Sequence, residues 1–425
     1  MLHLASIKNI LYNLKGTVMF GKKKVLFDTI LSFSATMILQ VVVQFIIYPF
    51  FERGLGSGGY GELVYLMTFV NIVAEIGSSV SLERMKISAE KLTYNGDFAK
   101  INALFFLPVI PAAFIYLFAG HVHLGIAETI CFIFLCLFAM LRSYFNVDFR
   151  LSLNYTKYFL YFLSIAVGYI LGLTIWGKSG NWINVILLGE IFASLFIIFF
   201  SDHLKKKPFE MSEESNRNIL LALPVVTSGL MTAIIFNMDR ILLKIICSSE
   251  EVALFYIAGL FGKTMSLVSM PLNNVAIGYL AKYKGKFTVG LLMKIVLIAI
   301  VFGALATGAC TVGSYIVIPF LYPETSVEAS KYYLIANISS IIYFITGFFG
   351  VILLRYGKER CQLYANIVYA VAFFALCVPA CIFWGIKGLC YALIAVTFCK
   401  FSAVIIMCIS EIKKREKEEL TKING

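Results

Sequence analysis

The sequence has few charged residues and no long polar segment. Only 14% of its 425 residues are Asp, Glu, Lys or Arg, whereas 60% are hydrophobic, and the mean hydropathy is +0.87. A soluble domain is nearer half apolar and a quarter charged. The polar intervals between apolar runs reach roughly twenty residues at most, which leaves no room for a soluble catalytic domain. The composition therefore predicts an all-α, polytopic membrane protein.

Motifs for catalysis, metals and nucleotides are also missing. The four histidines are scattered and the ten cysteines show no metal-ligand spacing, so neither a metal site nor a disulfide framework is predicted. No nucleophile elbow, P-loop or zinc motif is present. The stretch Gly54–Gly59 fits a GxGxxG pattern, but no strand precedes it and it is interpreted as a tight turn. We therefore expect no enzymatic activity and no cofactor.

Apolar runs long enough to cross a bilayer make up most of the chain. A helix needs about 20 apolar residues to span the hydrocarbon core. On that measure the sequence predicts twelve transmembrane helices: Phe27–Phe50, Tyr60–Val80, Ile101–Ala119, Leu124–Phe145, Tyr158–Trp176, Trp182–Ser201, Ile219–Ile246, Val252–Leu280, Val289–Ile318, Tyr332–Leu354, Leu363–Trp384 and Gly388–Ile409. An even number of spans places both ends of the chain on the same side of the membrane.

Basic residues indicate which side that is. The net charge is +12, and 28 of the 36 Lys and Arg residues fall in the two terminal segments and in the loops predicted to share their side. The opposite loops hold five and the spans hold three. Because cytoplasmic loops carry the basic excess, both termini are predicted to be cytoplasmic. Membrane orientation, rather than nucleic-acid binding, explains the positive charge.

The spans are predicted to form two six-helix halves around a central cavity. The parts are a cytoplasmic N-terminal segment (1–26), the N-terminal half (27–201), a cytoplasmic linker (202–218), the C-terminal half (219–409) and a basic cytoplasmic tail (410–425). Within the first segment, apolar residues at helical spacing over Leu4–Leu14 suggest a helix on the membrane surface. The turn after the first span of each half is similar in the two halves. This indicates a parallel repeat, in which substrate would lie between the halves near the bilayer midplane.

Polar side chains inside the predicted spans are the candidates for function. A charged side chain within a membrane segment costs a few kcal/mol and usually faces a partner or a wet cavity. The candidate substrate-binding and translocation residues are Gln40, Gln44, Asn71, Glu75, Arg84, Asp239, Arg240, Lys263 and Lys400. We expect Glu75, Arg84, Asp239, Arg240 and Lys263 to line one water-accessible space. The alternative for each is a structural role, as a buried hydrogen-bonded acid or an ion pair.

Several of these residues lie within longer motifs. The turn Arg53–Gly61 resembles the R-x-LG-xx-x-YG turn of the multidrug/oligosaccharidyl-lipid/polysaccharide exporter superfamily. The segment Glu75–Arg84 is similar to an acidic stretch followed by a basic residue in the Wzx-type polysaccharide-repeat flippases of that superfamily. Asp239-Arg240 followed by Ser249–Tyr256 resembles their DR … S-EEVG-Y signature. Two later turns are also similar, Phe320–Glu324 and Leu354–Arg360, whereas the chain departs from the pattern at Ile76 and Ala253.

This resemblance implies an O-antigen or capsule flippase of the bacterial cytoplasmic membrane. Such a protein moves an undecaprenyl-pyrophosphate-linked oligosaccharide repeat unit between leaflets by alternating access, for lipopolysaccharide or another surface polysaccharide. The implied partners are the lipid-linked oligosaccharide, membrane lipids, and the polysaccharide polymerase with its chain-length machinery. A pyrophosphate needs cations, which Arg84, Arg240 and Lys263 offer. Glu75 or Asp239 could couple transport to a proton or sodium gradient.

Two other functions remain open at this point. A cation-coupled drug or metabolite antiporter of the same superfamily would share the fold, but the several bases in the spans count against it. A membrane-embedded glycan polymerase should have a large outer loop with arginines, and the sequence has none.

Overall fold

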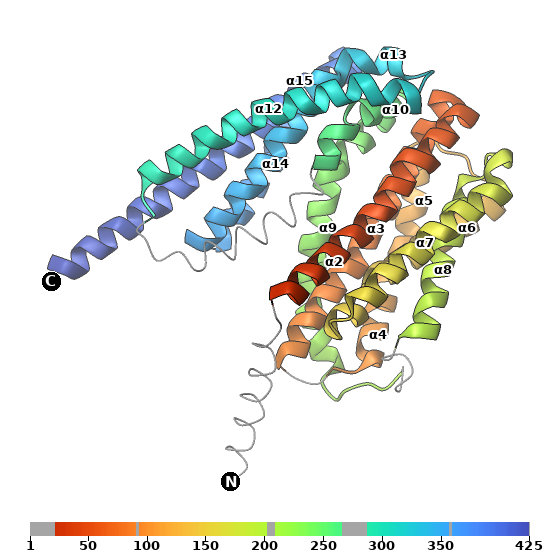
Figure 1. Cartoon of the computed structure of the whole chain (residues 1–425), viewed down its shortest axis with the longest axis horizontal. Helices are drawn as coiled ribbons and strands as arrows, with labels where there is room; N and C mark the ends of the chain where they lie inside the picture. The colour runs from red at the N-terminus through yellow and green to blue at the C-terminus, as the bar shows by residue number, and fades with distance from the viewer. Residues whose placement is uncertain (1–21, 91–92, 202–208, 266–286, 357–358, 425) are drawn as a thin grey trace, which may run out of the picture. The chain divides into compact units, whose positions relative to one another are not determined.

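The computed structural model describes residues 22–90, 93–201, 209–265, 287–356 and 359–424. Within these ranges the chain is helical and contains no strand (Figure 1). The longer helices are α2 (Lys22–Val42), α3 (Tyr48–Glu90), α4 (Asn95–Phe106), α5 (Val109–Ala119), α6 (Ile126–Leu151), α7 (Tyr155–Trp176), α8 (Trp182–Phe200), α9 (Ser215–Ile246), α10 (Ser249–Ala258), α12 (Val289–Leu321), α14 (Tyr333–Tyr356) and α15 (Glu359–Asn424). Short elements are the π-helix η1 (Val43–Ile47), the 3-10 helices η2 (Gly177–Ser179) and η3 (Ser330–Tyr332), and α13 (Ser326–Ala329). The predicted surface helix over Leu4–Leu14 lies outside the described residues.

The all-helical membrane fold predicted from composition is confirmed. Nine helices in the described ranges are long and apolar enough to cross a membrane. Two of them are long enough for two spans each, and each is interrupted by a glycine with non-helical backbone, Gly56 in α3 and Gly385 in α15. Most of the predicted span Val252–Leu280 lies beyond the described residues. The count of twelve therefore stays a prediction.

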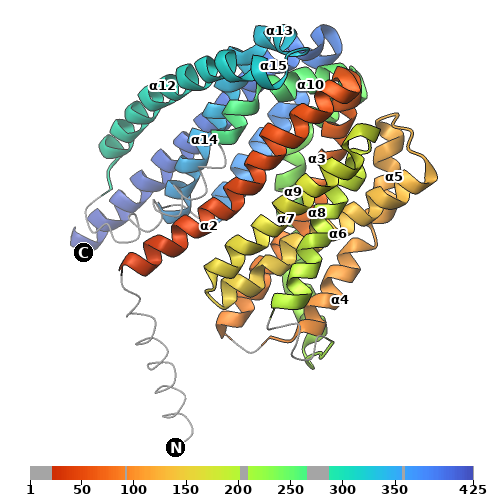
Figure 2. The same cartoon turned by 45° about the vertical axis from the view of Figure 1, so that its right-hand side comes forward.

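Close packing divides the chain into two units. Unit 1 contains residues 1–47, 73–111 and 124–230, and unit 2 contains 48–72, 112–123 and 231–425. In unit 1, α7 lies beside both α8 and α2, and the two views in Figures 1 and 2 agree on this arrangement. Glycines allow α7 and α8 to pack closely. A Cβ on Gly168 would lie only 2.7 Å from the Cα of Gly189, so a side chain there would push the two helices apart. Division of the chain into two six-helix halves is not addressed by these units and stays a prediction.

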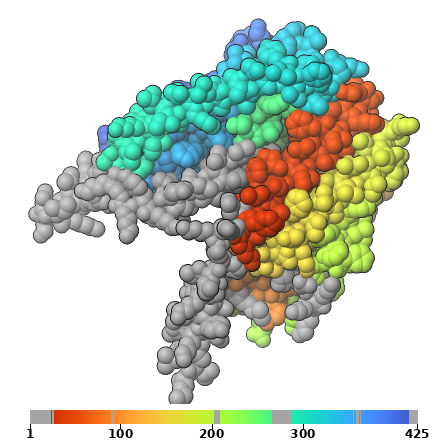
Figure 3. All heavy atoms as spheres, in the orientation of Figure 1, coloured from red at the N-terminus to blue at the C-terminus, as the bar shows by residue number. Residues whose placement is uncertain are grey.

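Unit 2 is built on α12, α14 and α15, which pack against one another. Their buried core includes Leu292, Ile341, Phe349, Val404 and Cys408, drawn from all three helices. On the other side, α12 lies at the molecular surface, as the teal atoms in Figure 3 show. Its exposed side chains are large and apolar, namely Leu297, Ile298, Val301, Leu305, Ile316 and Phe320. A contiguous apolar surface of this length fits contact with lipid rather than water.

Three of the segments that carry the family resemblance, Arg53–Gly61, Ser249–Tyr256 and Phe320–Glu324, meet within unit 2. Arg53 Nη2 donates to the carbonyl of Phe320 at 2.7 Å. The guanidinium thus supplies a hydrogen-bond donor to a carbonyl in the last turn of α12. The buried carboxylate of Glu52 accepts a hydrogen bond from Thr325. Lys244 Nζ lies 3.2 Å from Glu62 and 2.5 Å from Ser249 Oγ. Residues far apart in the sequence thus form one cluster of turns, which gives the motifs a structural reason to occur together.

Gly61 is expected to be indispensable for this cluster. A Cβ at Gly61 would lie 1.7 Å from the carbonyl oxygen of Ser249, so Gly61→Ala must displace the start of α10. Overpacking of this kind costs about 1–3 kcal/mol. The melting temperature of the detergent-solubilised protein should fall, or folded protein should be lost. Gly54→Ala is the matched control, because nothing lies within 4 Å of a Cβ there, and a Gly54→Ala variant that melts as low as Gly61→Ala would contradict the account.

Candidate functional site

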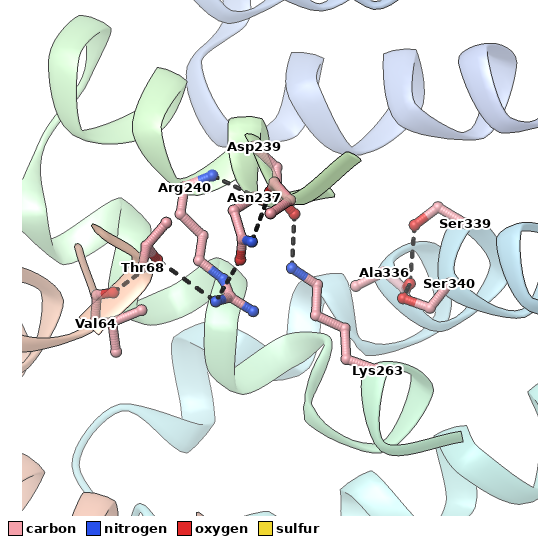
Figure 4. A network of polar contacts seen from close by, with 10 residues as sticks. Val64, Thr68, Asn237, Asp239, Arg240, Lys263, Ala336, Ser339 and Ser340 are labelled. Carbon is pink, nitrogen blue, oxygen red and sulfur yellow. Dashed lines mark hydrogen bonds and ion pairs between the residues drawn. The ribbon is translucent and has the colours of Figure 1, made fainter. Parts of the chain in front are cut away.

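An ion pair between α9 and the helical segment 260–265 forms the centre of the candidate site. Lys263 Nζ lies 2.6 Å from Asp239 Oδ2, and the two side chains are 18% and 9% exposed (Figure 4). The other carboxylate oxygen accepts from the backbone N–H of Arg240 at 2.8 Å. Asp239 therefore has both oxygens occupied, and the Lys263 ammonium also lies 5.0 Å from the centre of the Phe255 ring.

Arg240, the next residue on α9, does not join this ion pair, and its guanidinium has other partners (Figure 4). Its Nη1 donates to Asn237 Oδ1 at 3.2 Å and reaches Thr68 Oγ1 of α3 at 3.5 Å. The guanidinium carbon lies 4.7 Å from the centre of the Tyr256 ring. No acidic side chain in the described part of the chain forms an ion pair with Arg240, and its buried Nε donates to no described atom. Because a guanidinium has five N–H donors, the described residues use fewer than half of its hydrogen-bonding capacity.

A small cavity with both polar and apolar lining adjoins the ion pair within unit 2. It has a volume of about 50 Å³, enough for a few waters, and we call it the Asp239 pocket. Its lining includes the side chains of Asp239, Lys263, Ser339, Ser340, Tyr343, Tyr369 and Thr397. Residues with hydroxyl groups from α14 and α15 therefore line the pocket together with the ion pair. A cavity of this composition can hold water and a charged group inside an otherwise apolar helix bundle.

Lys400 approaches the same pocket from α15. Its Nζ lies 4.5 Å from the ring centre of Tyr343 and 4.9 Å from that of Tyr369, and both rings line the pocket. No acidic group among the described residues forms an ion pair with Lys400. Three basic side chains and one acidic side chain therefore gather here, so the site has a positive excess in their ordinary charge states.

Glu75, a second predicted acid, belongs to unit 1 and lies on α3 beside α9. Ser79 Oγ lies 3.4 Å from its carboxylate oxygen. A Cβ on Gly229 of α9 would lie 3.3 Å from that carboxylate and 2.2 Å from the Ser79 hydroxyl, so the glycine makes room for both. The carboxylate has no cation partner among the described residues.

Arg84 is held by polar partners of its own unit. It donates to Tyr144 OH at 2.6 Å and to Asn95 Oδ1 at 2.7 Å, and Asp148 lies 3.7 Å away. The residue is only 2% exposed, and its guanidinium lies 5.3 Å from the centre of the Phe98 ring. These contacts suit a structural role, since they join α3, α4 and α6.

The three predicted amides lie in different settings. Gln40 is half-buried on α2, Gln44 is half-buried in the π-helix η1, and Asn71 is exposed on α3. π-Helical turns are often found at functional sites, which draws attention to Gln44. The structure brings together Asp239, Arg240, Lys263 and Lys400 within unit 2. Glu75 and Arg84 belong to unit 1, so their predicted place in one cavity with Asp239, Arg240 and Lys263 stays a prediction.

Several side chains near the ion pair were not predicted. Tyr343, Tyr369 and Thr397 line the pocket, and Thr68 and Tyr256 contact Arg240. Tyrosine and threonine are common in transmembrane helices, so their presence in an apolar run carries no signal. A second buried ion pair was also missed, Arg142 Nε to Glu190 at 2.8 Å in unit 1. Tyr169 OH donates to the same carboxylate at 2.7 Å.

Solved structures with the same fold are membrane transporters. A lipid II flippase, MurJ, in an inward closed conformation aligns with a TM-score of 0.62 and 13% identity, over 89% of each chain. A transporter of the MOP superfamily from Pyrococcus furiosus, whose binding pocket is described as having reverse polarity, aligns at 0.59 and 14% identity, over 92% of this chain and 95% of that one. The eukaryotic MATE transporter AtDTX14 aligns at 0.57 and 14% identity, over 93% and 99%. No family model and no curated protein sequence matches the chain.

These likenesses show the fold. The chain is a multi-pass helical protein that shares the fold of these three solved proteins over nearly its full length. In the described residues no group of three or more His, Cys, Asp or Glu side chains is placed to hold a metal ion.

Proposed function

We propose that the protein is a flippase for an undecaprenyl-pyrophosphate-linked oligosaccharide repeat unit, acting in the bacterial cytoplasmic membrane by alternating access. The observation that carries the proposal is the positive excess at the Asp239 pocket and Arg240. The Asp239 carboxylate pairs with Lys263, whereas the nearby bases Arg240 and Lys400 form no ion pair with an acidic side chain among the described residues. Desolvated cations favour an anionic ligand, and a guanidinium with unused donors suits a phosphate oxygen. The resemblance of the turns to Wzx-type flippases supports a glycan as the remainder of the cargo.

Each residue has a distinct role in this proposal. Arg240 binds the pyrophosphate through its free donors, while Asn237 and the Tyr256 ring hold the guanidinium in place. Asp239 keeps Lys263 charged and oriented through the 2.6 Å ion pair. Release of that ion pair would leave Lys263 available to the pyrophosphate and Asp239 available to a proton or sodium ion. Coupling to an ion gradient would then act through one carboxylate.

A cation-coupled drug antiporter is the second candidate. It is supported by the MATE transporters among the similar structures and by Glu75, a carboxylate with no described cation partner. A cationic drug would bind to an acid in an otherwise apolar cavity. The three bases around Asp239 oppose this reading, because they would repel such a cargo.

Ligand-induced stabilisation distinguishes the two candidates. A ligand that binds only the folded protein raises the melting temperature, and the rise grows with the ratio of ligand concentration to Kd. We expect inorganic pyrophosphate to raise the melting temperature of the purified protein, and Lys400→Met to weaken this effect. Tetraphenylphosphonium, an organic cation, should have no effect. Stabilisation by tetraphenylphosphonium and not by pyrophosphate would reject the flippase in favour of the antiporter.

The orientation of the protein in the membrane gives a separate test. The basic asymmetry predicts that the chain end at Gly425 and the linker 202–218 both face the cytoplasm. Fusions of a cytoplasm-active reporter at Gly425 and within the linker should both be active. An active periplasmic reporter at either position would exclude the twelve-span topology.

A further inference from the structure

Two cysteine thiols contact each other in unit 2, outside the Asp239 pocket. The Sγ atoms of Cys247 and Cys381 are 3.3 Å apart, although 134 positions separate the residues in the sequence. Both are free thiols. A disulfide bond is about 2.05 Å long, so the two sulfurs need to approach by only about 1.3 Å.

Each cysteine lies close to the end of a helix or to an interruption in one. Cys247 follows the last residue of α9, and its N–H closes the final turn on the carbonyl of Leu243. Cys381 lies in α15 between Pro379, which lacks a backbone donor, and Gly385, whose φ is +56°. The helix therefore lacks one backbone hydrogen bond before Cys381 and is interrupted after it, so a small movement there costs little.

We propose that Cys247 and Cys381 form a reversible disulfide. Cys247 is half-buried and Cys381 is 1% exposed, so Cys247 is the thiol that an external reagent can reach. As its thiolate, Cys247 attacks one sulfur of a partner protein's disulfide, forms a mixed disulfide and expels the first partner thiolate. Cys381, losing its proton, then attacks Cys247 and expels the second partner thiolate. Two electrons and two protons pass to the partner, which leaves as a dithiol.

The predicted topology places this pair where such oxidants occur. The turn after α9 lies on the side opposite to the basic loops, which is the outer side in our orientation. Oxidising compartments outside the cytoplasm maintain disulfides, whereas the cytoplasm keeps thiols reduced.

Closure of the disulfide would tie together two helices that line the Asp239 pocket. α9 carries Asp239, eight residues before Cys247, and α15 carries Tyr369 and Thr397 on either side of Cys381. This step rests on the proposed function. If α9 and α15 separate during transport, oxidation of the two cysteines should slow transport. The disulfide is therefore a redox-sensitive lock on the pocket.

The experiment uses the full chain in native membranes, reduced and then exposed to glutathione disulfide. Free thiols are counted after denaturation by the gel shift of a maleimide-polyethylene glycol reagent. Wild type should lose two of its ten thiols, and Cys247→Ser should lose none. Cys381→Ser should lose one and carry a glutathione adduct at Cys247, the trapped mixed disulfide. Cys377→Ser, one turn earlier on α15, is the matched control and should still lose two.

Two results would overturn the proposal: wild type that keeps ten thiols, or wild type that stops at the glutathione adduct. Transport by oxidised and reduced wild type is then compared, with Cys247→Ser as the insensitive control. Oxidation should lower transport severalfold in wild type alone. Equal transport by the two forms would reject the lock, whereas absence of transport in both forms would instead reject the proposed function.

Discussion

Arg240→Ala is expected to lose most of the transport activity while the protein still reaches the membrane at its normal level. The substitution removes the guanidinium but leaves the Asp239–Lys263 ion pair in place. A hydrogen bond to a charged group contributes about 1.5–3 kcal/mol, so loss of one such contact to the pyrophosphate lowers transport by about ten- to hundredfold. The readout is surface glycan per unit of membrane-inserted protein, in a strain that lacks its own flippase.

Arg240→Lys separates charge from geometry in the same assay. Lysine keeps the positive charge but is a compact point donor without the planar fork of arginine. We expect transport by Arg240→Lys to fall between that of wild type and that of Arg240→Ala. Normal glycan display by Arg240→Ala, at normal protein abundance, would remove Arg240 from the substrate path.

Asp239→Ala is expected to reduce the amount of folded protein more than any other single change at the site. The substitution strands the Lys263 ammonium, which is 18% exposed, without its partner. Breaking one side of a buried ion pair costs about 3–5 kcal/mol. The abundance and melting temperature of the membrane-extracted protein should therefore both fall. The double variant Asp239→Ala/Lys263→Ala should recover much of the abundance, because no buried charge is then left unpaired, but it should not recover transport.

A surface ion pair of the same length provides the matched control. Lys331 and Glu328 are also 2.6 Å apart, but their side chains are 59% and 60% exposed. Exposed ion pairs contribute little to stability because water screens them, so Glu328→Ala should leave abundance and melting temperature nearly unchanged. A double variant at Asp239 and Lys263 that regained full transport would show that the pair is purely structural.

The sequence identified candidate residues most successfully where a charged side chain lies in an apolar run, because burial of an unpaired charge costs free energy. Asp239, Arg240 and Lys263 stand out because a charge within an apolar run must have a partner or water. In the structure all three belong to one unit, and Asp239 and Lys263 form an ion pair. Hydropathy also predicted where the apolar helices lie. At Gly56 and Gly385, however, two predicted spans belong to one longer helix that is interrupted at the glycine.

Side-chain partners across helices were beyond the sequence. Helical spacing says which residues share a face, but it does not say which helix that face meets. Arg84 illustrates the limit, because its partners Tyr144 and Asp148 lie about 60 positions away on α6. The pocket tyrosines, Tyr343 and Tyr369, were missed for the same reason, since only their approach to Lys400 distinguishes them from core residues.

Direct translocation of a lipid-linked glycan tests the central claim. The purified protein is reconstituted into liposomes with a fluorescent polyprenyl-pyrophosphate oligosaccharide, and a membrane-impermeant glycosidase reports how much glycan is on the outer face. We expect the protein, and not Arg240→Ala, to move the protected glycan into the enzyme's reach, while ethidium supplied to the same liposomes is not transported. Transport of ethidium without any movement of the pyrophosphate-linked glycan would contradict the account.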